Sequence, residues 1–167
     1  MSLFGRPFGA VLLWALMGSS ALAAEAAGDA QGTGAYWRLT FSPLAVHYHY
    51  EPTHRYVWGL GVERQDDEDW LVGLAYFRNS FGQPSGFAYV GKRYPGLFGR
   101  EQAFGQLSGG ILYGYRGEYK NEVPYNHHGF SPGAMASLGW QFDRNRAVTV
   151  HFLGTAALMV QLSYDLH

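Results

Sequence analysis

The chain has 167 residues, no cysteine and a formal net charge of −1, and 15% of its residues are charged. It can therefore form no disulfide, and its charge gives no reason to expect a nucleic-acid partner. Aromatic residues make up 17% of the chain, and 23 residues are glycine. This composition is typical of a small β-barrel of the bacterial outer membrane, in which aromatic side chains gather at both membrane interfaces. On composition alone, a secreted β-sandwich remains an alternative.

The N-terminus has the pattern of a secretory signal peptide. Arg6 precedes an apolar run over residues 10–17, and small residues then lead to Ala-Leu-Ala at Ala21 to Ala23. The apolar run is too short to cross a bilayer as a helix. The pattern predicts a signal peptide over residues 1–24, a short periplasmic segment over 25–35 and a barrel domain over 36–167.

From residue 44 onward, large apolar residues tend to alternate with small or polar residues with period two, which predicts β-strands. In the first run, Leu44 and Val46 share one face, and Ala45 and His47 share the other. The predicted strands cover residues 44–50, 57–64, 70–77, 86–94, 104–115, 134–142, 147–153 and 157–167. Bacterial barrels have an even number of strands, each about 9 to 11 residues long. The predicted fold is all-β, an eight-stranded antiparallel transmembrane barrel.

Strand parity assigns the connections to two sides of this barrel. With both termini in the periplasm, the turns at 65–69, 95–102 and 143–146 are periplasmic. The connections at 51–56, 78–85, 116–131 and 154–155 are then extracellular. Two of the extracellular connections are longer and carry the unusual residues, so this rim is the predicted functional side.

Three residues at this rim suggest chemistry. His47 lies on the inward face near the outer end of the first strand, and Asn79 and Ser80 lie in the second outer loop. A histidine that polarises a serine hydroxyl, with a carboxyl or amide group that orients it, is the usual arrangement for acyl transfer. A polar rim that only solvates a loop explains the same residues, and no nucleophile elbow is present.

Other polar residues near the loops have alternative explanations. Histidines raise the question of a metal site, but no cysteine or regular carboxylate spacing accompanies them, so no metal site is predicted. These histidines are His49, His54, His127 and His128. Basic residues at the outer rim could meet lipopolysaccharide phosphates, although solvated loop ends explain them almost as well. The basic residues near loops are Arg55, Arg78, Lys92, Arg93, Arg116 and Lys120.

Two prolines fall in or beside predicted strands. Pro43 lies within the first strand pattern, and Pro132 lies at the start of the sixth. Proline removes a hydrogen bond from the ladder, so each proline predicts a weak seam in the wall. A seam near the outer leaflet would let an acyl chain enter the interior sideways. A simple strand start is the alternative for both prolines.

Part of the chain resembles the lipid A palmitoyltransferase (PagP) family. The resemblance is carried by Ser-Pro-Leu-Ala-Val-His at Ser42 to His47, a glycine-rich strand at 58–64, an acidic turn ending at Trp70, and Gly-Leu-Ala-Tyr-Phe-Arg-Asn-Ser-Phe at Gly73 to Phe81. It covers mainly residues 42–94. It implies a barrel in the outer membrane of a Gram-negative bacterium that moves a palmitoyl chain from a phospholipid donor to lipid A.

The family's essential residues can be placed on this sequence. Its histidine falls on His47 and its serine on Ser80, whereas its aspartate falls on Asn79. An amide cannot take a proton or stabilise an imidazolium by charge, so Asn79 is expected to orient the other groups or to alter activity.

The leading hypothesis is acyl transfer to lipid A or a related outer-leaflet lipid by a monomer without a cofactor. His47 would act as base or orienter, Ser80 as oxyanion donor or nucleophile, and Asn79 as orienter. Eight strands leave no aqueous channel, so the interior holds side chains or one acyl chain. The residues expected to line an acyl slot are Leu71, Gly73, Ala75 and Phe77. The alternative is a noncatalytic barrel that binds lipid or another surface ligand, or braces the envelope.

Overall fold

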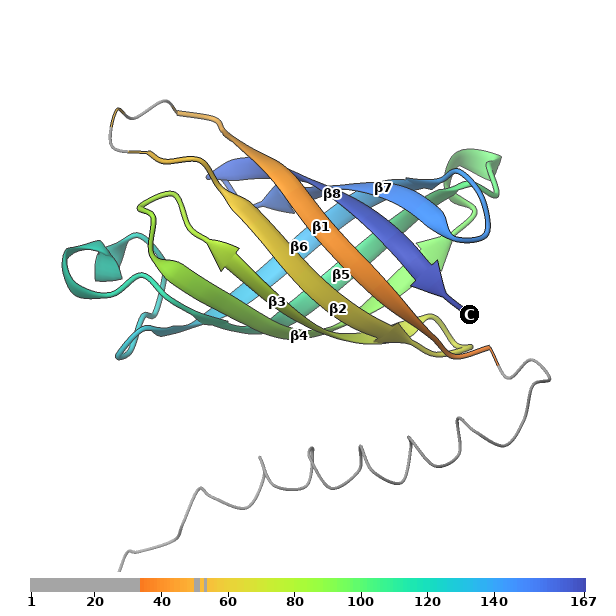
Figure 1. Ribbon diagram of the computed structural model, residues 1–167, viewed down its shortest axis with the longest axis horizontal. Coiled ribbons are helices and arrows are strands. Elements are labelled where there is room, and N and C mark those ends of the chain that lie inside the picture. Colours follow the sequence, from red (N-terminus) through yellow and green to blue (C-terminus); the bar gives the residue numbers. More distant parts are fainter. Residues whose placement is uncertain (1–33, 50–51, 53) are drawn as a thin grey trace, which may run out of the picture. The chain divides into compact units, whose positions relative to one another are not determined.

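The computed structural model describes residues 34–49, 52 and 54–167. This part of the chain forms a closed barrel in which each strand pairs with its sequence neighbours and β1 pairs with β8 (Figure 1). The strands are β1 (Tyr36–His47), β2 (Trp58–Gln65), β3 (Trp70–Arg78), β4 (Pro84–Pro95), β5 (Ala103–Tyr113), β6 (Phe130–Gln141), β7 (Arg146–Leu153) and β8 (Ala157–Leu166). The predicted eight-stranded antiparallel barrel is confirmed. The predicted signal peptide at 1–24, and residues 25–33 of the segment after it, lie outside the described residues.

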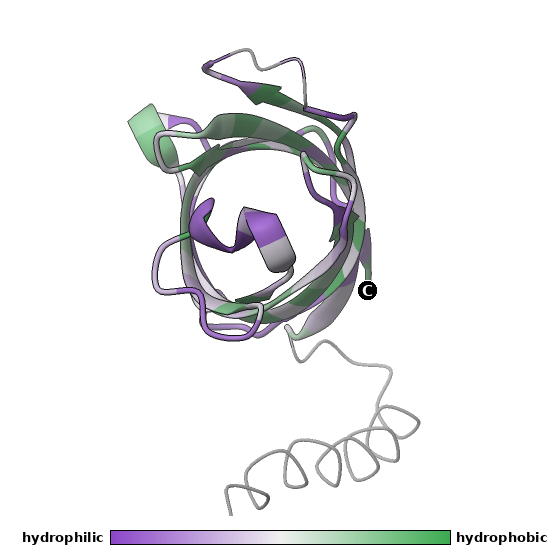
Figure 2. Cartoon of the chain, turned by 90° about the vertical axis from the view of Figure 1, so that its left-hand side faces the viewer, coloured by the Kyte–Doolittle hydropathy of each residue, from purple (hydrophilic) through white to green (hydrophobic). Residues whose placement is uncertain are grey.

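Two short 3-10 turns, η1 (Leu97–Gly99) and η2 (Gly117–Asn121), complete the described elements. None of the helical turns in the described ranges is long and apolar enough to cross a membrane. Four connections, after β1, β3, β5 and β7, lie at one end of the barrel, which we call the loop end. The connections after β2, β4 and β6 lie at the other end, the turn end. In Figure 2 the hydrophilic turn η2 lies across the ring of strands at the loop end.

Several predicted strand boundaries are wrong, and the largest differences are at the starts of β1 and of β6, which begins at Phe130 and not at 134. The first strand begins at Tyr36 and not at 44. Within it, the register between β1 and β8 shifts between Phe41 and Leu44, which marks a β-bulge. The extra residue of this bulge interrupts the period-two alternation, so no single run covered the whole strand. The fifth strand ends at Tyr113, since Tyr115 has a φ of 51° and leaves the extended conformation.

Outward-facing side chains form an apolar band between two rings of aromatic residues. At the turn end the exposed aromatic residues are Trp37, Trp70, Tyr94, Trp140, Phe142 and Tyr164. At the loop end they are Tyr48, Tyr56, Tyr76, Tyr113 and Phe130. Exposed aliphatic residues between the rings include Leu39, Leu44, Leu60, Val72, Leu74, Val90, Leu107, Ile111, Leu138 and Leu162. The alternation is therefore inverted relative to a water-soluble protein, with apolar residues outside.

Inward-facing glycines make room for large rings in the narrow interior. Gly73 of β3 lies against the ring of Tyr89, and Gly139 of β6 lies against the ring of Phe104. A Cβ atom at either glycine would overlap the ring that it faces. Replacement of either glycine would therefore displace a ring from the close-packed interior.

A cluster of charged side chains lies inside the barrel towards the turn end. Arg38 is fully buried; its Nε donates to Oδ1 of Asp165 at 2.5 Å and its Nη1 donates to Oε2 of Glu63 at 2.9 Å. The hydroxyl of Tyr89 donates to Oε1 of Glu63 at 2.7 Å. Buried charges are stable only when they are paired and hydrogen-bonded. These bonds join β1, β2, β4 and β8 across the interior, a link that the sequence alone did not predict.

Candidate functional site at the loop end

The connection between β3 and β4 is a tight turn organised by the side chain of Asn79. Its Oδ1 accepts hydrogen bonds from the backbone N–H groups of Phe81 at 3.0 Å and Gln83 at 2.9 Å. The Asn79 N–H donates to the carbonyl of Gln83 at 3.0 Å, and Gly82 has the left-handed φ of 75° that favours glycine. Asn79 thus holds its own backbone, as short amide side chains often do in turns.

Ser80 follows Asn79 and is held from both sides. Its carbonyl accepts the backbone N–H of Arg55 at 2.7 Å, which joins the β1–β2 connection to this turn. Its side chain interacts with the hydroxyl of Tyr115, which comes from the β5–β6 connection. Burial raises the pKa of Tyr115, and the hydrogen bond with Ser80 opposes this rise. Ser80 is only 7% exposed, so a substrate can reach it only if the covering loops move or if it is approached from the interior.

A chain of aromatic contacts connects the first, second and third outer connections. The rings of His47 and His54 lie 4.3 Å apart, and the ring of His54 lies 5.6 Å from that of Phe81. Phe81 stacks on Tyr119 of η2 with a separation of 4.2 Å and an interplanar angle of 15°. His54 therefore lies between His47 and the residue that follows Ser80. The structure adds a second histidine to the predicted rim, while direct hydrogen bonding of His47 to Ser80 stays a prediction.

The β5–β6 connection is fastened to the same turn by a reciprocal pair of hydrogen bonds. The side-chain amide of Gln83 donates to the carbonyl of Arg116 at 3.1 Å and accepts from its N–H at 2.9 Å. Together with the Phe81–Tyr119 stack, these bonds hold η2 over the loop end (Figure 2). Sequence reasoning missed both His54 and Tyr115 as site residues. It treated His54 only as a possible metal ligand, and it placed Tyr115 on the outward face of a strand.

Each proline lies in a strand segment that pairs with only one of its two neighbouring strands. The β1–β2 ladder ends at Ser42 and Gly59, so the segment from Pro43 to His47 pairs only with β8. The β6–β7 ladder ends at Ala136 and Phe152, so the segment that contains Pro132 pairs only with β5. The predicted interruptions therefore lie in the loop-end half of the wall, between β1 and β2 and between β6 and β7. Passage of a lipid through them stays a prediction.

The predicted acyl-slot residues face the interior along β3. Leu71 and Gly73 are buried, and Ala75 and Phe77 are half-buried. The Tyr89 ring occupies the space beside Gly73 and hydrogen-bonds the charged cluster through Glu63. Any acyl chain in the interior would therefore be confined to the loop-end half, beside Ala75 and Phe77.

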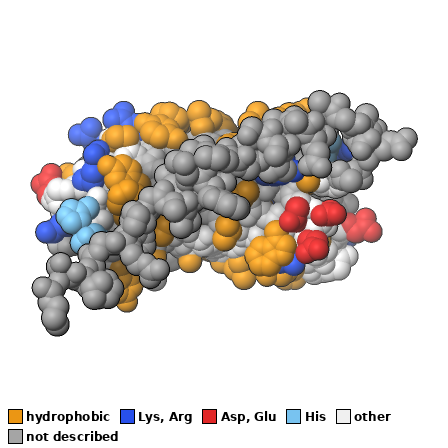
Figure 3. All heavy atoms as spheres, turned by 90° about the horizontal axis from the view of Figure 1, so that it is seen from below, with side chains coloured by type: hydrophobic (Ala, Val, Ile, Leu, Met, Phe, Trp, Pro, Cys, Tyr) orange, Lys and Arg blue, Asp and Glu red, His pale blue; other side chains and the backbone are white. Residues whose placement is uncertain are grey.

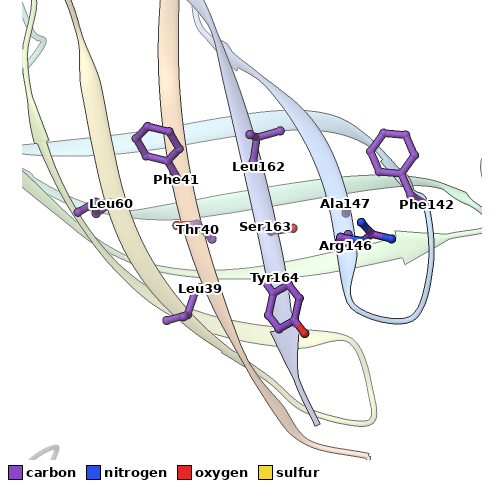
Figure 4. A pocket seen from close by; sticks show the side chains of 10 residues that line it. All are labelled: Leu39, Thr40, Phe41, Leu60, Phe142, Arg146, Ala147, Leu162, Ser163 and Tyr164. Carbon is purple, nitrogen blue, oxygen red and sulfur yellow. The ribbon is translucent and has the colours of Figure 1, made fainter.

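A separate concavity of about 740 Å³ lies on the outside of the wall. Its side chains come from β1, β2, β7 and β8 and from the turn before β7 (Figure 4). They include Leu39, Phe41, Leu162 and Tyr164, which are exposed on the outer wall. This groove is a lateral surface feature and does not contain the predicted acyl-slot residues or Ser80.

Within the described ranges, no group of three or more histidine, aspartate or glutamate side chains is placed to hold a metal ion. Comparisons of the chain with protein-family models and with curated proteins find no match.

The structure predicts that two substitutions of Asn79 differ in their effect on the free energy of unfolding. Asn79→Ala removes both side-chain hydrogen bonds of the turn and should lower the free energy of unfolding by about 1 to 3 kcal/mol. Asn79→Asp preserves both bonds, because a carboxylate oxygen accepts from the same N–H groups. Urea unfolding followed by tryptophan fluorescence measures the difference. Equal losses for the two variants would contradict the role of Oδ1 in the turn.

Proposed function

We propose that this protein is an outer-membrane barrel that transfers an acyl chain from a phospholipid to lipid A or a related outer-leaflet lipid, in the manner of the PagP family. The apolar outer wall with an aromatic ring at each end supports the membrane setting, since transmembrane barrels have an apolar band flanked by such girdles. The clustering of His47, His54 and Ser80 at one end supports the chemistry. The observation that carries the proposal is this cluster beside the segment of β1 that pairs with β8 but not with β2.

The transfer can be written with the groups at the loop end. An acceptor hydroxyl attacks the ester carbonyl of the phospholipid while the imidazole of His47 takes its proton. The Ser80 hydroxyl donates a hydrogen bond to the developing oxyanion. Collapse of this intermediate forms the new ester and breaks the old one, and the imidazolium returns its proton to the leaving lysophospholipid oxygen. In the version with Ser80 as nucleophile, its hydroxyl oxygen carries the acyl chain between the two lipids.

The position of Asn79 defines its part in either version. Its oxygen is engaged by the turn, and its Nδ2 is buried without a hydrogen-bond partner among the described residues. It would therefore keep Ser80 in place and would not act as an acid or base. A family member with aspartate at this position would have a negative charge at the same end of the barrel as His47 and His54, and a nearby negative charge stabilises an imidazolium.

Mass spectrometry of lipid A tests the proposal. Cells that express the protein should contain lipid A with one additional acyl chain, whereas cells with an empty vector should not. Purified protein in detergent, supplied with phospholipid and lipid A, should produce the same species together with lysophospholipid. Absence of both products, under conditions in which an authentic palmitoyltransferase is active, would remove the enzymatic proposal.

The noncatalytic alternative has one observation in its favour. Ser80 is nearly buried and its side chain is engaged with Tyr115. A rim that only stabilises its own loops would have the same contacts. If lipid A is unchanged but the purified protein retains a tightly bound lipid through extraction, the lipid-binding barrel becomes the better description.

A further inference from the structure

Two arginines, Arg55 from the β1–β2 connection and Arg78 from the end of β3, converge on the turn that contains Ser80. The guanidinium of Arg78 donates from Nη2 to the carbonyl of Gly82 at 2.9 Å. Arg55 lies against the same glycine, because a Cβ atom at Gly82 would be 2.9 Å from Cδ of Arg55 and 3.4 Å from its Nη1. Both side chains are exposed. Two positive charges are therefore held close together by one residue of the turn.

These charges are not neutralised by the rest of the described chain. Neither Arg55 nor Arg78 forms an ion pair with a carboxylate among the residues that the structure describes. A guanidinium has five N–H donors, and the bond to Gly82 uses one of those of Arg78. The remaining N–H groups can donate to the oxygens of a tetrahedral anion, since arginine forms forked, charge-assisted hydrogen bonds with phosphate oxygens.

The position of Arg78 on the wall identifies where such an anion would come from. Outward-facing residues of β3 are Trp70, Val72, Leu74 and Tyr76, all exposed, and Arg78 is next on the same face. The apolar stripe thus ends in a positive charge directly after the aromatic ring of the loop end. This is the height at which lipid headgroups meet a membrane barrel.

The described residues of the loop end have a net positive charge. Its Lys and Arg residues are Arg55, Arg78, Arg116 and Lys120, against the acidic residues Glu118 and Glu122, and Figure 3 shows a group of acidic side chains at the turn end. The turn between β2 and β3 supplies the acidic residues Asp66, Asp67, Glu68 and Asp69. This asymmetry makes the loop end the more favourable end for an anionic headgroup.

We propose that Arg55 and Arg78 form a binding site for the phosphate group of an outer-leaflet lipid and hold that lipid beside Ser80. The site lies next to the segment of β1 that pairs with β8 but not with β2, because Trp58, the first residue of β2, is the ladder partner of Arg78. A lipid held by its phosphate here would have its ester region close to the turn and its chains along the wall. The inference rests on the proposed function, which places the loop end at the outer leaflet.

Binding measurements on the Ser80→Ala protein test the site without turnover. The full chain in detergent micelles is titrated with bisphosphorylated lipid A, with the same lipid lacking phosphates, with phosphatidylglycerol and with inorganic phosphate. Substitution of Arg55→Gln together with Arg78→Gln should weaken binding of the phosphorylated lipid roughly tenfold or more, because two charge-assisted bonds are lost. Binding of phosphate-free lipid A should be unchanged. The phosphorylated lipid that loses most affinity identifies the source of the phosphate.

A matched control removes the same charge from the opposite end. Arg100→Gln together with Arg144→Gln changes two exposed arginines near the turn end, and this variant should bind all four ligands like its parent. The proposal is overturned if both double variants lose affinity equally, if the parent does not prefer phosphorylated lipid, or if only inorganic phosphate binds. If wild-type protein transfers no acyl chain but its phosphate-dependent lipid binding requires the two arginines, the proposed function fails and the binding site stands.

Discussion

Replacement of Arg38 with methionine should lower the free energy of unfolding by about 3 to 5 kcal/mol. Arg38 neutralises Asp165 and Glu63, and these two carboxylates are 2% and 1% exposed. Methionine has a similar length but no charge, so both carboxylates would lose the cation that hydrogen-bonds to them and keep only the electrostatic influence of buried Arg93, which forms no ion pair with either among the described residues. The expected loss comes from this uncompensated burial and not from lost apolar contact.

Urea unfolding in lipid vesicles, followed by tryptophan fluorescence, measures this loss. Arg64→Met is the control, because Arg64 lies outside the cluster and its guanidinium is 5.7 Å from the centre of the Trp37 ring. It should change stability by less than about 1 kcal/mol. Addition of Glu63→Gln and Asp165→Asn to the Arg38→Met protein should restore part of the loss. A destabilisation by Arg38→Met no larger than that of the control would contradict the role of the cluster.

Substitution of Ser80 with alanine is expected to lower the rate of acyl transfer by at least about a hundredfold. Removal of one oxyanion-hole donor costs about 100- to 1,000-fold in rate. Removal of a nucleophile costs far more, on the order of a millionfold in a serine protease. The size of the loss therefore distinguishes the two roles proposed for Ser80. Single-turnover assays with labelled phospholipid and lipid A measure it.

The neighbouring serine of the next strand supplies a matched control. Ser85 is also buried, at 3% exposure, and its hydroxyl hydrogen-bonds only to the carbonyl of Gln83 among the described residues. Ser85→Ala should retain the wild-type rate within a few-fold. If Ser80→Ala and Ser85→Ala have equal rates, Ser80 has no chemical role. His47→Ala and His54→Ala, assayed in parallel, show which imidazole transfers the proton, because loss of a general base costs about 100- to 10,000-fold.

Much of the barrel could be predicted from local alternation. In β3, Leu71 and Gly73 face inward while Val72 and Leu74 face outward, as the period-two pattern indicates. Successive side chains of a strand point to opposite faces, so the facing of a residue depends only on its position in the run. The alternation failed at Pro43 because a bulge adds a residue, and at Tyr115 because its backbone leaves the extended region.

By itself the sequence determined the number of strands, the order of the connections and which loops share one end of the barrel. Only the tertiary structure decided which side chains meet. Arg38 and Asp165 are 127 positions apart in the sequence, and closure of β1 on β8 with one particular register brings them together. His54 and Tyr115 likewise reach the Ser80 turn through loop conformations that have no periodic pattern. Local alternation specifies faces, whereas register and loop geometry depend on packing between segments that are distant in the chain.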